Sequence, residues 1–117
     1  MNFKQIAKKA TTLAEIMMDR DKISTEEIID DFDGYITITE IEWCDMGENS
    51  AWAYAFEEDK DKFAFAGKVL GNVFNACLAA CGGDYEELYK KWEPLRVKIS
   101  SGRTKKNQQV TLVEILD

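Results

Sequence analysis

The spacing of apolar residues predicts two helices at the start of the chain. Residues 3–18 place apolar side chains at steps of three and four, which gives a helix one apolar face. Ser24 and Glu27 then form a capping-box signature, which predicts that a second, short helix begins there. Asp33–Gly34 is a turn signal, so we expect residues 1–33 to form a helical N-terminal segment.

Two strands are predicted next by β-branched and aromatic residues in alternation. The first covers residues 35–43, but its apolar positions change parity between Thr39 and Glu40. Because successive side chains point to opposite faces of a strand, this change predicts a β-bulge or a strand bent across two layers. The second covers residues 51–58, alternates aromatic residues with alanines, and is expected to pair with the first.

The remainder of the chain predicts a central helix and a closing hairpin. Residues 63–66 fit either a very short strand or the entry to a helix. A broad apolar stripe over residues 69–81 predicts a long helix that ends at Gly82–Gly83. A short helix follows and stops at Pro94, and two alternating segments then predict a hairpin with a loop longer than two residues.

This order of elements predicts a single α+β domain. We expect residues 1–117 to form one unit, in which the N-terminal segment 1–33 is helical. Residues 34–117 are expected to form an antiparallel sheet packed on the central helix.

Charge is sorted strongly along the chain, whose formal net charge is −7. Residues 15–59 contain fifteen acidic and two basic residues, a net charge of −13, whereas residues 1–14 and residues 95–117 each carry +3. The long-range potential follows local clusters of charge as well as the total. An acidic chain of this kind can therefore still bind phosphates through a local basic face.

The predicted hairpin gathers the cations of the C-terminal segment. Arg96 and Lys98 share one side of their strand, and Arg103, Lys105 and Lys106 are expected to crown the loop. Together they predict a continuous cationic ridge that neutralises phosphates without reading a base sequence. The alternative is a solvated hairpin tip with no ligand.

Aromatic residues are the second requirement of a single-strand binder, because bases stack on them. The candidates on the predicted sheet are Tyr35, Trp43, Trp52, Tyr54 and Phe56. An aromatic stripe on a strand is also typical of a core. The sequence leaves open whether the aromatic face of residues 51–58 is buried, with a nearly bare alanine face outside, or the reverse.

Several classes of function lack the residues they need. The chain has no histidine, no phosphate-binding glycine loop and no CxxC pair among its three cysteines, so we expect neither an enzyme, nor a metal site, nor a cofactor. No apolar run of about 18 residues is present, and the N-terminus lacks the apolar region of a signal peptide. The expected location is the cytoplasm, with no membrane contact.

Three segments, "GYITITEIEW", "KFAFAGKVLGNVF" and "VKISSGRTKKNQQVTLVEIL", together with an aromatic strand that ends in "FEED", carry a family resemblance. In this order they resemble small single-stranded-DNA-binding proteins of phages and prophages in Gram-positive gut bacteria, over most of the chain from about Phe3 to Leu116. The resemblance implies an OB-like barrel, although a four-stranded ββαββ sheet satisfies the same pattern.

We therefore expect sequence-tolerant binding of single-stranded DNA in phage or mobile-element replication or recombination, alongside other proteins of those processes. Phosphates would be contacted by Arg96, Lys98, Arg103, Lys105 and Lys106, and bases would stack on Trp43, Trp52 and Tyr54. One alternative is an acidic protein-binding factor, such as a phage inhibitor or DNA mimic, that acts through the surface from Glu26 to Asp33. Another is a homo-oligomer that pairs exposed sheet edges.

Overall fold

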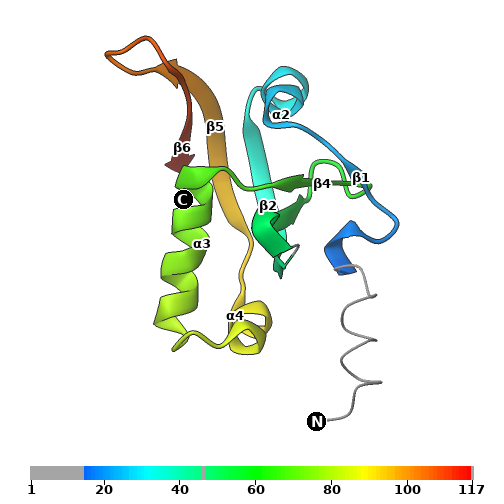
Figure 1. Cartoon of the computed structure of the whole chain (residues 1–117). Coiled ribbons are helices and arrows are strands. Elements are labelled where there is room, and N and C mark those ends of the chain that lie inside the picture. Colours follow the sequence, from blue (N-terminus) through cyan, green and yellow to red (C-terminus); the bar gives the residue numbers. More distant parts are fainter. Residues whose placement is uncertain (1–14, 46, 117) are drawn as a thin grey trace.

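One mixed β-sheet organises the part of the chain that the structure, a computed structural model, describes: residues 15–45 and 47–116 (Figure 1). Its strands are β1 (Asp21–Lys22), β2 (Tyr35–Cys44), β3 (Ala51–Phe56), β4 (Lys62–Phe65), β5 (Leu95–Arg103) and β6 (Gln109–Ile115). The helices are α2 (Thr25–Phe32), α3 (Lys68–Ala80) and α4 (Tyr85–Lys91), with the 3-10 turns η1 (Glu15–Met17) and η2 (Gly47–Asn49).

The strands lie in the order β1-β4-β3-β2-β5-β6. Every neighbouring pair is antiparallel except β1 and β4, which are parallel. The described strands form an open sheet with β1 and β6 at its edges, so the α+β class is confirmed. The sheet contains two strands more than the four-stranded alternative, because residues 62–65 form β4 and residues 21–22 form β1 within the segment that we expected to be helical.

A break in the register of β2 bends this sheet, as the sequence predicted. Residues 35–38 of β2 pair with β5, whereas residues 38–44 pair with β3, and the register shifts between Ile38 and Glu40. The shift lets β2 place apolar side chains of opposite parity, Ile38 before it and Ile41 after it, in one core.

The aromatic face of β3 forms the centre of that core, beneath α3. Trp52, Tyr54 and Phe56 are only 3%, 1% and 1% exposed, and Phe74 of α3 lies edge-to-face against Trp52 and Tyr54. The indole N–H of Trp52 donates to Asn75 Oδ1 at 2.8 Å, which satisfies its polar atom. These rings therefore hold the sheet and α3 together.

The alanine face of β3 is covered as well. Ala53 and Ala55 pack in a second apolar cluster with Cys44, Phe63 and Ile16. The expectation that this face is nearly bare when the aromatic face is buried is therefore wrong, because the chain segment that contains η1 returns across it.

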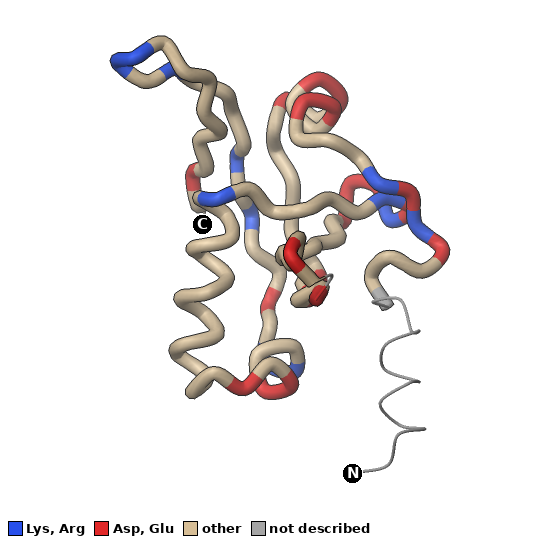
Figure 2. The backbone as a smooth tube through the Cα atoms, in the orientation of Figure 1, with Lys and Arg blue, Asp and Glu red and all other residues tan. Residues whose placement is uncertain are grey.

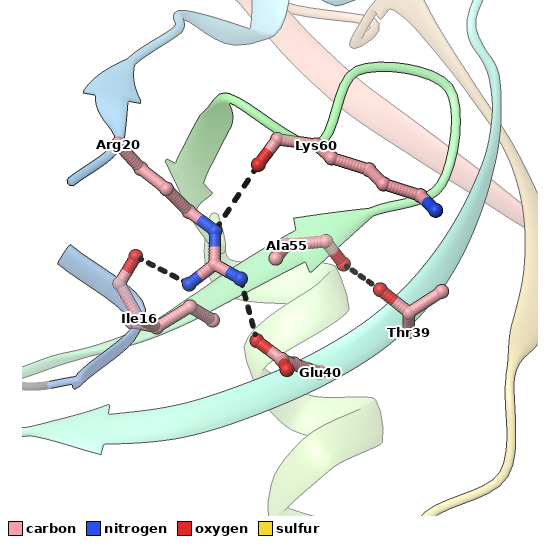
Figure 3. Close-up of polar contacts among 6 residues, drawn as sticks. All are labelled: Ile16, Arg20, Thr39, Glu40, Ala55 and Lys60. Carbon is pink, nitrogen blue, oxygen red and sulfur yellow. Dashed lines mark hydrogen bonds and ion pairs between the residues drawn. The ribbon is translucent and has the colours of Figure 1, made fainter. Parts of the chain in front are cut away.

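An arginine fixes that returning segment beside the bend of β2 (Figure 3). The Arg20 guanidinium donates to the carbonyls of Lys60 at 3.3 Å and Ile16 at 3.2 Å, and to Glu40 Oε2 at 3.0 Å. Nearby, the Thr39 hydroxyl donates to the Ala55 carbonyl at 3.4 Å. One planar side chain thus joins three separate segments, which the fork of a guanidinium does better than an ammonium group.

The helix ends follow the local signals. The Ser24 side chain accepts from the Glu27 N–H at 3.2 Å, which confirms the predicted capping box at the start of α2. Helix α3 stops before Gly82 and Gly83, which adopt φ values of 67° and 78°. Most of the helix predicted over residues 3–18 lies outside the described residues, and its described end forms η1 instead.

Gly34 is held in a conformation that only glycine adopts without strain. It has φ 82°, and a Cβ atom there would lie 1.9 Å from the Ile99 carbonyl oxygen. We expect Gly34→Ala to lower the free energy of unfolding by about 3 kcal/mol in urea denaturation. The control is Gly71→Ala, where a Cβ meets open space inside α3 and should raise that free energy by about 0.5–1 kcal/mol. Equal effects of the two substitutions would contradict this assignment.

Cys44 should be the protected thiol of this protein. Burial, assisted by the negative charge of Glu42, raises the pKa of Cys44 from 9.0 to about 11. A folded-state pKa above the unfolded value means that the thiol stabilises the fold fully below pH 9, and that this contribution is lost as pH rises toward about 11. At pH near 8 we expect a thiol reagent, followed by mass spectrometry, to modify the partly exposed Cys81 first. Cys44 should react only at the rate of unfolding.

Candidate nucleic-acid interface

The β5–β6 hairpin contains all five residues that were predicted to contact phosphates. Its strands pair without a register shift from Val97↔Ile115 to Arg103↔Gln109, and a five-residue loop, 104–108, joins them. Within the loop the Thr104 N–H donates to the Gln108 carbonyl at 2.9 Å, and Asn107 adopts a left-handed φ of 62°. The prediction of a loop longer than two residues is confirmed.

The cations of this hairpin fall into two groups. Arg103, Lys105 and Lys106 are exposed and lie at the tip, where Figure 2 shows a group of basic residues along the backbone. Arg96 and Lys98 lie nearer the base of β5, opposite Thr37 and Tyr35 of β2. None of the five forms an ion pair with another described residue.

The five cations do not form the predicted continuous ridge, because successive side chains of β5 point to opposite faces of the sheet. Because the register is regular, Arg103 has the parity of Val97 and Ile99, which point into the core. Arg96 and Lys98 have the other parity and point to the outer face of the sheet. The hairpin therefore carries cations on both faces and at its tip.

The predicted stacking residues are brought together, but inside the protein. Trp52 and Tyr54 are buried beneath α3, and Trp43 is partly buried with its ring 5.4 Å from that of Trp52, edge to face. The Trp43 backbone N–H donates to the Tyr89 hydroxyl at 2.8 Å, which anchors the strand against α4. In this conformation Trp52 and Tyr54 offer no open ring face for a stacked base.

Tyr35 is the aromatic side chain that the outer face does expose. It is 45% exposed, and Lys98 Nζ lies 5.1 Å from the centre of its ring. The two residues are directly opposite each other on β2 and β5. The parity of β2 carries this signal, since Tyr35 has the opposite parity to the buried Ile36 and Ile38. Tyr35 is one of the five aromatic candidates in the sequence but not one of the three residues on which bases were predicted to stack.

Carboxylates border this outer face and limit its basic area. Glu114 of β6 lies opposite Lys98. Glu58 accepts from the Thr37 N–H at 2.7 Å and from the Thr37 hydroxyl at 3.1 Å. The acidic residues of α2 are grouped on a separate helix (Figure 2). A polyanion would therefore be favoured along β5 toward the hairpin tip and disfavoured toward α2.

Helix α2 carries the acidic surface from Glu26 to Asp33 that the sequence offers as an alternative, protein-binding site. Its exposed acidic side chains are Glu26, Glu27, Asp30 and Asp31, with Asp33 at the C-cap. Ile28 is fully buried and fixes the helix on the core. Among the described residues, no cation forms an ion pair with these acids.

The described residues offer neither a metal site nor a membrane-spanning helix. They contain no group of three or more cysteine and acidic side chains placed to hold a metal ion. None of their helices combines the length and the apolar character needed to cross a membrane.

Comparison with known proteins found no match, whether with a family model, a curated protein or a solved structure.

Proposed function

We propose that this protein binds single-stranded DNA in a sequence-tolerant manner through the outer face of β5 and the hairpin tip. The observation that carries the proposal is the exposed ring of Tyr35 beside Lys98, on the same face as Arg96. A partly exposed ring beside cations that form no ion pair supplies both parts of single-strand binding, namely base stacking and phosphate neutralisation.

The path of the strand follows from the charges. It would begin at the tip with Arg103, Lys105 and Lys106 and continue along β5 to Lys98 and Tyr35. An OB-like use of the sheet fits this path, because the bent β2 serves both halves of the sheet and the last hairpin flanks the binding face. The phage or mobile-element setting, with its replication and recombination partners, rests on the sequence resemblance.

Removing two tip cations should weaken DNA binding and its dependence on salt. For Lys105→Ala/Lys106→Ala we expect lower affinity for a labelled thymidine oligonucleotide in fluorescence polarisation between about 50 and 200 mM salt. The slope of log affinity against log salt should become shallower by about 0.7 for each phosphate that the variant no longer neutralises.

The matched control is Lys60→Ala/Lys90→Ala, which removes the same charge from exposed lysines outside the hairpin. An equal loss of affinity in both double variants would show that net charge alone acts. If the unmodified protein does not bind at about 50 mM salt, the DNA proposal fails, and the acidic surface of α2 becomes the candidate interface.

Tyr35→Ala should separate stacking from charge. We expect a loss of about 1–3 kcal/mol, or about 5- to 150-fold in Kd, with an unchanged salt slope, because no cation is removed. Tyr35→Phe keeps the ring and should bind nearly as well as the unmodified protein. If the alanine variant also keeps full affinity, Tyr35 is not the stacking platform.

A further inference from the structure

A hollow of about 260 Å³ lies between the first turn of α3 and the inner face of the β5–β6 hairpin. Its walls are aliphatic, with Val69 on the α3 side and Ile99 and Val113 on the hairpin side. The hydroxyl-bearing residues Thr25 and Thr111 also line it. It is separate from the outer face that carries Tyr35 and Lys98, because Ile99 and Lys98 point to opposite sides of β5.

Tyr54 reaches this hollow from β3. The residue is only 1% exposed, and its side chain lines the hollow while its ring packs against Phe56 and Phe74. None of the described residues forms a hydrogen bond with the Tyr54 hydroxyl. Burial accordingly raises the pKa of Tyr54. A ligand with a hydrogen-bonding edge would relieve the desolvation of this group.

The first turn of α3 adds an electropositive group to the same hollow. Gly67, the N-cap, provides no side-chain hydrogen bond to the helix, and the first bond of the helix runs from the Gly71 N–H to the Gly67 carbonyl at 2.8 Å. The N–H groups of residues 68–70 therefore lack acceptors within the helix, and these residues line the hollow. With Lys68 beside them and no acid in the first turn, they favour an anion.

We propose that this hollow binds one nucleotide unit, with its base between the aliphatic walls and its phosphate at the start of α3. The base edge would form a hydrogen bond with the Tyr54 hydroxyl. A plain alkyl chain would fill the walls but would leave that hydroxyl without a partner. The choice of a nucleotide rests on the proposed function, and Arg103 supports it because it lies farther along the same face of β5 as Ile99. The unit is either a base of the bound strand or a free mononucleotide.

The test measures binding of thymidine 5′-monophosphate and of a thymidine oligonucleotide by calorimetry, with thymidine and inorganic phosphate as partial ligands. Tyr54→Phe removes only the hydroxyl and should lower affinity for the mononucleotide about 2- to 10-fold. Its melting temperature should stay equal or rise, because the hydroxyl that is removed has no partner among the described residues.

Gly67→Asp supplies a second and independent variant. A Cβ at residue 67 meets open space, and its extended backbone accepts any residue. An aspartate there should cap α3 and raise the melting temperature, while its carboxylate occupies the anion position and lowers mononucleotide affinity by more than about tenfold. Gly71→Ala is the control, since it should also stabilise α3 but should leave binding unchanged.

The outcomes separate the two proposals. If oligonucleotide binding depends on Lys105 and Lys106 but neither ligand is affected by Tyr54→Phe or Gly67→Asp, the hollow is not a nucleotide site and the DNA proposal stands. If only the mononucleotide binds, and both variants weaken it, the hollow is a site for free nucleotides and the DNA proposal fails. Equal affinity for phosphate and for the mononucleotide would overturn the role of the base. An unmodified protein that binds neither ligand would overturn both proposals.

Discussion

The register shift between Ile38 and Glu40 is the constraint on which the rest of this structure depends. It allows one strand to pair with β5 over its first half and with β3 over its second, while both halves direct apolar residues into one core. Beyond Ile38, β5 no longer pairs with β2, and side chains from the segment after α3 bond to this edge of β2 instead. The Trp92 indole donates to the Ile38 carbonyl at 3.2 Å, and the Tyr89 hydroxyl accepts from the Trp43 N–H at 2.8 Å. Two backbone groups on the free edge of the bent strand are thus satisfied by the segment containing α4.

Because β3 is covered on both faces, none of its rings is open to a stacked base. Its rings bind α3, and its alanines accept the segment that contains Ile16 and Arg20. The exposed basic and aromatic side chains therefore lie on the other half of the sheet, where β5 and β6 extend beyond the core. That half also carries the C-terminal cations, whereas most acids lie in the segment from η1 through β3 and its following loop. The separation of charge in the fold follows from the separation of charge in the chain.

The hairpin has two unlike faces, which under the proposed function would contact different parts of one ligand. The outer face combines the Tyr35 ring with Lys98 and Arg96, and suits a stacked base between phosphates. The inner face lines an aliphatic hollow that Tyr54 and the start of α3 also line. The cationic tip lies between the two faces, so a flexible strand could contact both. A rigid duplex is less suited to such a turn, because its bases are already paired and stacked.

The features that the sequence alone determined are those that depend on neighbouring residues. Ser24 and Glu27 specified the start of α2, and the change in parity after Ile38 specified the bend of β2. The alternation of β5 likewise placed Arg96 and Lys98 on one face. Hydrogen bonds within a few residues, and the two-residue period of a strand, are sufficient for these predictions.

Only the tertiary structure decided which face each strand buries. Parity divides β3 into an aromatic and an alanine face, but the contacts of α3 and Ile16 bury both and thereby withdraw Trp52 and Tyr54 from the surface. The two residues of β1 carry no strand pattern, and they form a strand because β4 offers its edge. The exposure of Tyr35 beside Lys98, and the approach of α3 to the hairpin, likewise join residues that are far apart in the sequence. Such contacts depend on where loops close and what covers each surface, and these are properties of the packed chain that no local pattern encodes.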